Sequence, residues 1–186
     1  MTITSPARAG AGTNQEGARR HNLGTLLGHV HRVGRLSRAE LTELMGLNRS
    51  TIGGLVAELE TLGLAQQVKS ESERMGAGRP SVDVVVGPRP FVLAIDVRVD
   101  GLSVARVGLG GVVQARASGP VPSAHDPEAT AESIVDLTRL VLREVRPDQT
   151  LVGVAVGVPG IVRAEDGLVR LAPNLGWTDL PFADML

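Results

Sequence analysis

Three hydrogen-bonding side chains stand together where the pattern predicts the start of a helix. Arg49, Ser50 and Thr51 follow directly on Asn48, and asparagine is a favoured N-cap residue. The first turn of a helix leaves backbone N–H groups free, and such groups bind anions. Guanidinium, amide and hydroxyl groups in this setting can bind phosphate and the polar edges of nucleic-acid bases. All four residues are therefore assigned to a predicted DNA-binding set.

A shorter helix is predicted immediately before this one. The run Ser37-Arg38-Ala39-Glu40 fits a capping box, in which the serine and glutamate satisfy each other's backbone N–H groups. Its expected buried residues are Leu41, Leu44 and Met45, and Gly46 ends it because glycine tolerates a left-handed turn. A short helix, a turn and a longer helix form a helix-turn-helix, whose second helix enters the major groove. Arg38 joins the predicted DNA-binding set.

The longer helix carries two adjacent glycines on its outward face. Its expected buried residues are Ile52, Leu55, Val56, Leu59 and Leu62, and its outward residues are Ser50, Gly53, Gly54 and Ala57. Each glycine costs roughly 1 kcal/mol relative to alanine inside a helix, so the pair indicates close approach to a partner. DNA backbone is one candidate, and Gly54 is assigned to it. Packing against another helix, in a protein-binding winged helix, is the alternative.

A charged loop follows between two predicted strands. The strands span residues 64–69 and 82–86, and the intervening loop is too long for a tight hairpin but suits a wing. Lys69 precedes this loop, which contains Arg74 and Arg79. Arginine suits a narrow minor groove because of its negative potential. These three cations complete the predicted DNA-binding set, with an exposed loop as the alternative for Arg74.

Residues outside the helix-turn-helix divide the chain into four parts. Residues 1–20 lack periodicity and are expected to form a disordered leader. A helix is predicted from His21 to Gly34, with an apolar stripe of Leu23, Leu26, Leu27, Val30 and Val33. The winged helix-turn-helix is assigned to residues 21–87 and a linker to residues 88–90. A second domain is assigned to residues 91–186.

The second domain begins with three β-rich runs, at 91–96, 102–107 and 112–117, which predict an antiparallel meander. Asp126-Pro127 then opens a helix that ends before Pro147, with Ala131, Ile134, Val135, Leu142 and Val145 on its apolar face. The run 151–158 is predicted to be a buried strand parallel to its partner. This order is typical of an α/β sheet, which is expected to be incomplete at Leu186.

Composition excludes several classes of protein. The 186 residues include no cysteine, which rules out disulfides and thiolate metal sites within them. Neither a signal peptide nor an apolar run of membrane-spanning length is evident, so the chain is expected to be cytoplasmic, with no membrane partner. Residues 1–90 hold 11 Lys/Arg and 8 Asp/Glu, whereas residues 91–186 hold 8 and 12. A mildly basic first half permits phosphate contact without requiring it.

Several motifs resemble those of the ROK family, which contains sugar-responsive repressors and sugar kinases. The helix-turn-helix runs 36–41 and 46–52, with Gly78-Arg79-Pro80, resemble the family's winged DNA-binding region. The runs 153–160 and 172–177 resemble its sugar-domain signature. The resemblance implies an α+β winged helix-turn-helix followed by a partial α/β, actin-like (ribonuclease-H-like) ROK domain.

The same resemblance bears on catalysis and on ligands. Kinases of the family hold ATP phosphates with an Asp-x-Gly-x-Thr loop, but here Arg98 replaces the glycine and Asp100 the threonine. A carboxylate there opposes phosphate, so we expect no enzyme activity and no cofactor. Gly160, Asn174 and Trp177 are the sugar-pocket candidates, because an asparagine amide can both donate and accept hydrogen bonds. The alternatives are a turn-shaping Gly160 and a packed Trp177.

Three functions remain open at this point. The first is a DNA-binding repressor of carbohydrate genes, with double-stranded operator DNA as partner and a sugar or sugar phosphate as effector. Such a protein is expected to form a homo-oligomer at full length. The second is a sugar kinase, and the third is a shortened DNA-binding or dimerising module without sugar response. The helix-turn-helix and the altered phosphate loop favour the first over the second.

Overall fold

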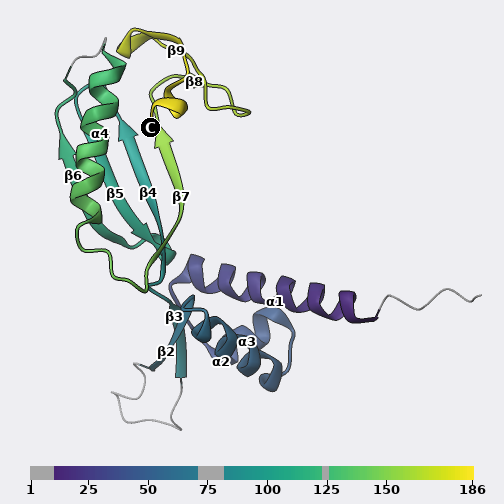
Figure 1. Cartoon of the computed structure of the whole chain (residues 1–186). Coiled ribbons are helices and arrows are strands. Elements are labelled where there is room, and N and C mark those ends of the chain that lie inside the picture. Colours follow the sequence, from purple (N-terminus) through teal and green to yellow (C-terminus); the bar gives the residue numbers. More distant parts are fainter. Residues whose placement is uncertain (1–10, 71–81, 123–125) are drawn as a thin grey trace, which may run out of the picture. The chain divides into compact units, whose positions relative to one another are not determined.

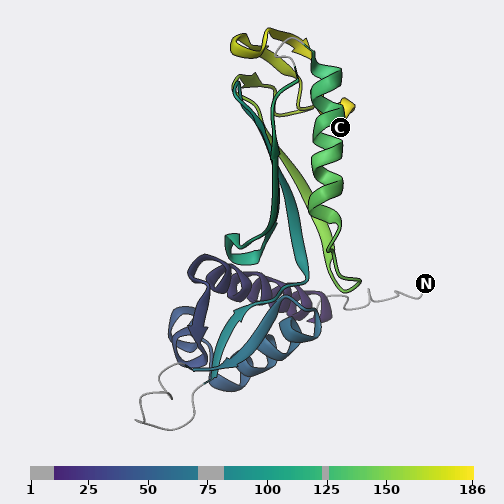
Figure 2. The same cartoon turned by 90° about the vertical axis from the view of Figure 1, so that its left-hand side faces the viewer.

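The structure is a computed structural model that describes residues 11–70, 82–122 and 126–186. The chain divides into two compact units, Met1–Gly87 and Pro88–Leu186, here named the N-terminal and the C-terminal unit. Their elements can be followed in two views (Figures 1 and 2). Each unit has its own hydrophobic core.

The N-terminal unit is a winged helix-turn-helix. Its elements are α1 (Ala11–Val33), β1 (Arg35–Ser37), α2 (Arg38–Met45), α3 (Arg49–Thr61), β2 (Ala65–Lys69) and β3 (Val82–Val86). The strands form an antiparallel sheet in the order β1-β3-β2. The sequence pattern did not indicate β1, because three residues are too few to show a period of two.

Local signals fix both ends of α2. The Ser37 Oγ accepts a hydrogen bond from the backbone N–H of Glu40 at 3.2 Å, and the Ser37 N–H donates to the Glu40 carboxylate at 2.7 Å. Hydrogen bonding to the Ser37 side chain, and then to its backbone, lowers the pKa of Glu40. Gly46 ends the helix with φ 63°, a left-handed conformation that favours glycine. The predicted capping box and its glycine stop are therefore present.

The core of the N-terminal unit lies between the three helices and the sheet. It consists of Leu26, Val30, Leu36, Leu41, Ile52, Leu55, Val56, Leu59, Ala65 and Val84. Three residues that the helical pattern placed in the core are instead exposed: Val33, Leu44 and Leu62. Each lies at the C-terminal end of its helix, where the chain turns at a following glycine of positive φ. At these three positions the apolar sequence pattern extends past the part of each helix that packs against the core.

The predicted leader is wrong for residues 11–20, which form the first turns of α1. Their sequence lacks an apolar stripe, and their charged side chains form ion pairs instead. Arg20 contacts Glu16 at 3.0 Å, four residues away on the same helix, and the Arg19 Nε donates to Glu58 of α3 at 2.7 Å. A tertiary ion pair has no local signature, and for this reason the pattern did not reveal it. Residues 1–10 lie outside the described residues.

The C-terminal unit is built on a mixed sheet. Its main elements are β4 (Pro90–Val97), β5 (Leu102–Gly108), β6 (Val113–Gly119), α4 (Pro127–Leu142) and β7 (Thr150–Gly157). The sheet order is β6-β5-β4-β7, with β7 parallel to β4 and the other pairs antiparallel. Asp126 caps α4, its Oδ1 accepting from the backbone N–H of Ala129 at 2.9 Å. Pro90, assigned to the linker, begins β4, since a strand's first residue tolerates proline.

One face of this sheet carries α4 (Figure 2), and the buried residues between them include Leu93, Ile95, Val104 and Ile134. The expectation that the run 151–158 is buried is wrong. Val152 and Val154 of β7 are 63% and 56% exposed. Because β7 is an edge strand and α4 packs mainly against β5 and β6, no helix in the described residues covers it.

A small antiparallel sheet follows β7, in the order β10-β9-β8. It consists of β8 (Ile161–Val162), β9 (Val169–Ala172) and β10 (Trp177–Leu180), with short 3-10 helices at Leu109–Gly111, Pro173–Leu175 and Phe182–Met185. Sequence patterning indicated none of these, since each is only two to four residues long. Among the described residues, no helix combines the length and apolarity that a membrane crossing requires.

Candidate nucleic-acid interface

The first turn of α3 is organised by Asn48. Its Oδ1 accepts hydrogen bonds from the backbone N–H of Thr51 at 2.9 Å and from the Ser50 hydroxyl at 2.7 Å. Asn48, Arg49 and Ser50 are exposed, and Thr51 is half-buried. The cap satisfies one of the free amides of the first turn. The Asn48 amide nitrogen and the other first-turn N–H groups remain as donors toward a ligand.

The predicted cations occupy two different settings. The Arg49 guanidinium has no hydrogen-bond or ion-pair partner within the described ranges, so its N–H donors are available to an external acceptor. Arg38 instead donates to the Gln67 side chain of β2, and the Gln67 backbone N–H donates to Glu60 of α3 at 2.9 Å. Arg38 therefore joins α2 to the sheet. Lys69 is exposed at the end of β2, whereas Arg74 and Arg79 lie outside the described residues.

The glycine pair of α3 faces open space. A Cβ atom built on either Gly53 or Gly54 would meet no atom of the described structure within 4 Å. The described part of the chain therefore supplies no neighbouring helix that would require glycine here. Two helix-weakening residues without an internal reason favour close approach to an external partner.

Replacing both glycines, Gly53→Ala with Gly54→Ala, is expected to raise the stability of the N-terminal unit by up to about 2 kcal/mol while weakening DNA binding. Far-UV circular dichroism on heating and a gel shift measure the two effects. Gly24→Ala in α1 is the matched control, since its Cβ also meets nothing within 4 Å. The control should gain stability and keep its DNA affinity. Unchanged affinity in the double variant would show that the glycines are merely tolerated.

Sequence reasoning missed residues of α1 that lie beside α3. A groove of about 400 Å³ is lined by Gln15, Ala18, Arg19, Asn22, Ser50, Thr51, Gly54 and Leu55. The α1 members were assigned to the leader or left without a role. Most of these residues are polar and do not extend the apolar stripe that begins at Leu23, so only their spacing of three and four residues on one helical face could have suggested a longer helix.

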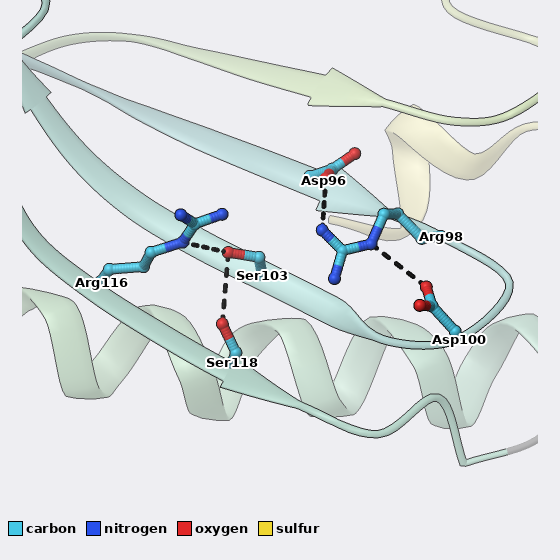
Figure 3. A network of polar contacts seen from close by, with 6 residues as sticks. All are labelled: Asp96, Arg98, Asp100, Ser103, Arg116 and Ser118. Atoms are coloured by element: carbon cyan, nitrogen blue, oxygen red, sulfur yellow. Dashed lines mark hydrogen bonds and ion pairs between the residues drawn. The ribbon is translucent and has the colours of Figure 1, made fainter.

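The β4–β5 turn in the C-terminal unit holds an arginine between two carboxylates (Figure 3). Arg98 contacts Asp96 and Asp100 at 3.2 Å each. The hydrogen bond to Asp100, with the charges of Asp100 and Asp96, raises the pKa of Arg98. On the neighbouring strands, the Arg116 Nε donates to the Ser103 hydroxyl at 2.9 Å. The Ser118 hydroxyl donates to the same Ser103 oxygen at 3.4 Å. The turn thus pairs its own cation internally, in place of a glycine-rich phosphate cradle.

The three sugar-pocket candidates occupy different environments. Asn174 is exposed in the 3-10 helix that follows β9. Trp177 is only 3% exposed and packs against Phe182 with ring centroids 4.7 Å apart, as the packed alternative expects. Its Nε1 has no hydrogen-bond partner in the described structure. Gly160 lies in the turn between β7 and β8, where a Cβ would collide with the backbone of Leu171.

Gly160→Ala is expected to destabilise the C-terminal unit by at least about 1 kcal/mol, because the new atom overpacks against backbone that cannot rotate away. Trp177 is the only tryptophan, so its fluorescence during urea unfolding follows this unit. Gly153→Ala in β7 is the control, since its Cβ would lie an ordinary 3.9 Å from Val92. Equal midpoints for both variants would contradict this steric role.

Known proteins resemble this chain over most of its length. Residues 24–74 match a family model described as MarR family. A putative xylose repressor of Caldicellulosiruptor sp. strain Rt8B.4 is 28% identical over 152 residues, covering 81% of this chain and 38% of that protein. The xylose repressor of Bacillus subtilis strain 168 is 26% identical over 156 residues, covering 83% and 40%. The chain thus spans about two fifths of the length of these relatives.

A solved structure shows the same fold. The crystal structure of a ROK family transcriptional regulator, a homolog of the E. coli MLC protein, aligns with a TM-score of 0.58 at 19% identity. The alignment covers 90% of this chain and 42% of that one. The chain therefore has a MarR-like winged helix-turn-helix, is similar to xylose repressors and shares the fold of this ROK family regulator.

Proposed function

We propose that the chain acts in sequence-specific, double-stranded DNA binding, as part of a repressor of carbohydrate-metabolism genes. The observation that carries this proposal is the outward end of α3, where Arg49 lacks an internal partner and Gly54 faces open space. A helix that enters the major groove reads bases with such first-turn side chains. Asn48, Ser50 and Thr51 add donors to the same turn, and Lys69, Arg74 and Arg79 supply the wing contacts.

The likeness to xylose repressors makes a pentose the first effector to test. Asn174 supplies an exposed amide for sugar hydroxyls, and Gly160 and Trp177 belong to the same two signature runs. A repressor of this kind is expected to act as a homo-oligomer, since paired recognition helices read paired half-sites. The effector would act by binding one of two protein conformations more tightly than the other.

A non-catalytic role accompanies this proposal. The Arg98 guanidinium is held by Asp96 and Asp100 at the position where ROK kinases are expected to hold phosphates. Two carboxylates around that turn oppose a triphosphate. Calorimetric titration with Mg·ATP is expected to show no heat of binding, and saturable binding would return the kinase reading.

Selection of bound duplexes from a random pool tests the DNA-binding function. The full chain is expected to enrich one sequence family, and the enriched duplex should bind more tightly than a scrambled duplex of equal length. Addition of xylose, with other pentoses and hexoses as comparisons, then tests release. Enrichment of no sequence would contradict sequence-specific binding.

A further inference from the structure

The groove between α1 and α3 has a lining of donors and one cation. Gln15, Arg19 and Asn22 lie on one face of α1, because residues four and three apart share a face of a helix. Ser50 and Thr51 line the opposite side from α3. No carboxylate is among the lining residues. This chemistry fits an anion with several acceptor oxygens.

Arg19 retains free binding capacity. Its Nε donates to Glu58 at 2.7 Å, and a second nitrogen also contacts that carboxylate. The Arg19 side chain is nevertheless 58% exposed, and a guanidinium carries five N–H donors. Glu58 therefore holds Arg19 at the border of the groove and leaves part of the guanidinium open to a second acceptor.

The groove adjoins the face of α3 that is proposed to meet DNA, since Ser50 and Gly54 belong to both. The major groove of DNA is about 12 Å wide, and a helix with its side chains is about 10–12 Å across. A helix seated there fills the width. An element packed beside it then meets the sugar-phosphate backbone at the rim rather than the base edges.

We propose that the first turns of α1 form a phosphate clamp on duplex DNA, with Arg19 as its cation and Gln15 and Asn22 as amide donors. This inference rests on the proposed DNA-binding function and deepens it. The ligand is the phosphodiester backbone, so the contact is independent of sequence. It adds affinity and orientation to the base contacts of α3.

Arg19→Gln tests the clamp, with fluorescence anisotropy of a labelled random-sequence duplex at several salt concentrations. Loss of one phosphate contact lowers the slope of log affinity against log salt by about 0.9. Arg20→Gln is the matched control, because it removes the same charge from the next residue, whose partner is Glu16 on the same helix. The control is expected to keep the wild-type slope. Equal slopes in wild type and Arg19→Gln would overturn the clamp.

Glu58→Gln separates a ligand role from a structural ion pair. If Arg19 binds phosphate, removing its carboxylate partner frees the guanidinium, and duplex affinity rises severalfold. If the pair serves only to fix α1, Glu58→Gln and Arg19→Gln lower the melting temperature alike and leave the salt slope unchanged. That second pattern would overturn the inference.

The two proposals fail in different ways. A wild-type chain that binds no duplex at low salt would overturn both the DNA-binding function and the clamp. The clamp alone would be overturned if Arg49→Ala abolishes DNA binding while Arg19→Gln keeps the wild-type slope of log affinity against log salt. Three results together would establish the clamp. Arg19→Gln should lower the salt slope, Arg20→Gln should leave it unchanged, and Glu58→Gln should raise duplex affinity.

Discussion

Ile52→Ala is expected to lower the free energy of unfolding of the N-terminal unit by about 2–5 kcal/mol. Ile52 is fully buried in the core that joins α3 to the other helices. Truncation removes apolar contacts and leaves a cavity that neighbouring side chains fill only partly. Because domains are stable by only about 5–15 kcal/mol in total, this loss should reduce the folded fraction and with it DNA binding.

Two optical signals assign the effect to one unit. Far-UV circular dichroism during urea unfolding should show an earlier transition, since most helical residues of the described structure lie in the N-terminal unit. Tryptophan fluorescence follows Trp177 in the other core and should keep its midpoint. Leu62→Ala, at the C-terminal cap of the same helix, is the control, because Leu62 is 44% exposed. If Leu62→Ala loses as much unfolding free energy as Ile52→Ala, the difference in burial between the two residues does not determine their contribution to stability.

The contrast between Ile52 and Leu62 shows how far a helical pattern predicts a core. Both residues fall on the same apolar stripe, and the pattern assigned both to the interior. Periodicity identifies the face of a helix, but the burial of each position depends on where neighbouring elements end. Leu62 caps α3, so it lies beyond the surface that the other helices cover.

Signals that are local in sequence predicted the structure best. The Ser37 capping box, the Asn48 cap and the Gly46 stop are all present. Each of them involves only residues that lie at most four positions apart in the sequence. The first turns of α1 instead include a contact between Arg19 and Glu58, which lie 39 residues apart in the sequence. Such a contact can be found only after the helices have been packed together.

The candidate interface divides in the same way. The first turn of α3 could be assigned from Asn48 and the residues that follow it, whereas the internal engagement of Arg38 by Gln67 depends on strand β2 lying beside α2. The sequence placed Arg38 and Arg49 in one DNA-binding set. The structure distinguishes them, since only Arg49 has its guanidinium free of partners within the described residues.

Arg49→Ala is accordingly expected to cost about 1–3 kcal/mol of binding free energy on the selected duplex and to relax the preference at one base pair. The side chain starts α3 and has no internal partner to replace, so its loss should leave folding unchanged and remove only the external contact. A bidentate arginine contact to guanine is the commonest specific contact in the major groove. Competition binding with single-base variants of the selected duplex locates the base pair.

Arg32→Ala is the control for charge alone. Arg32 lies in the last turn of α1, where its Nε donates to the backbone of Gly28 at 3.0 Å. Arg32 is thirteen positions along α1 from Arg19, roughly 20 Å along the axis, so it lies outside the proposed interface. Arg32→Ala should keep both affinity and base preference. If Arg49→Ala instead weakens binding equally on every duplex, Arg49 contacts phosphate and the base reader must be sought elsewhere on α3.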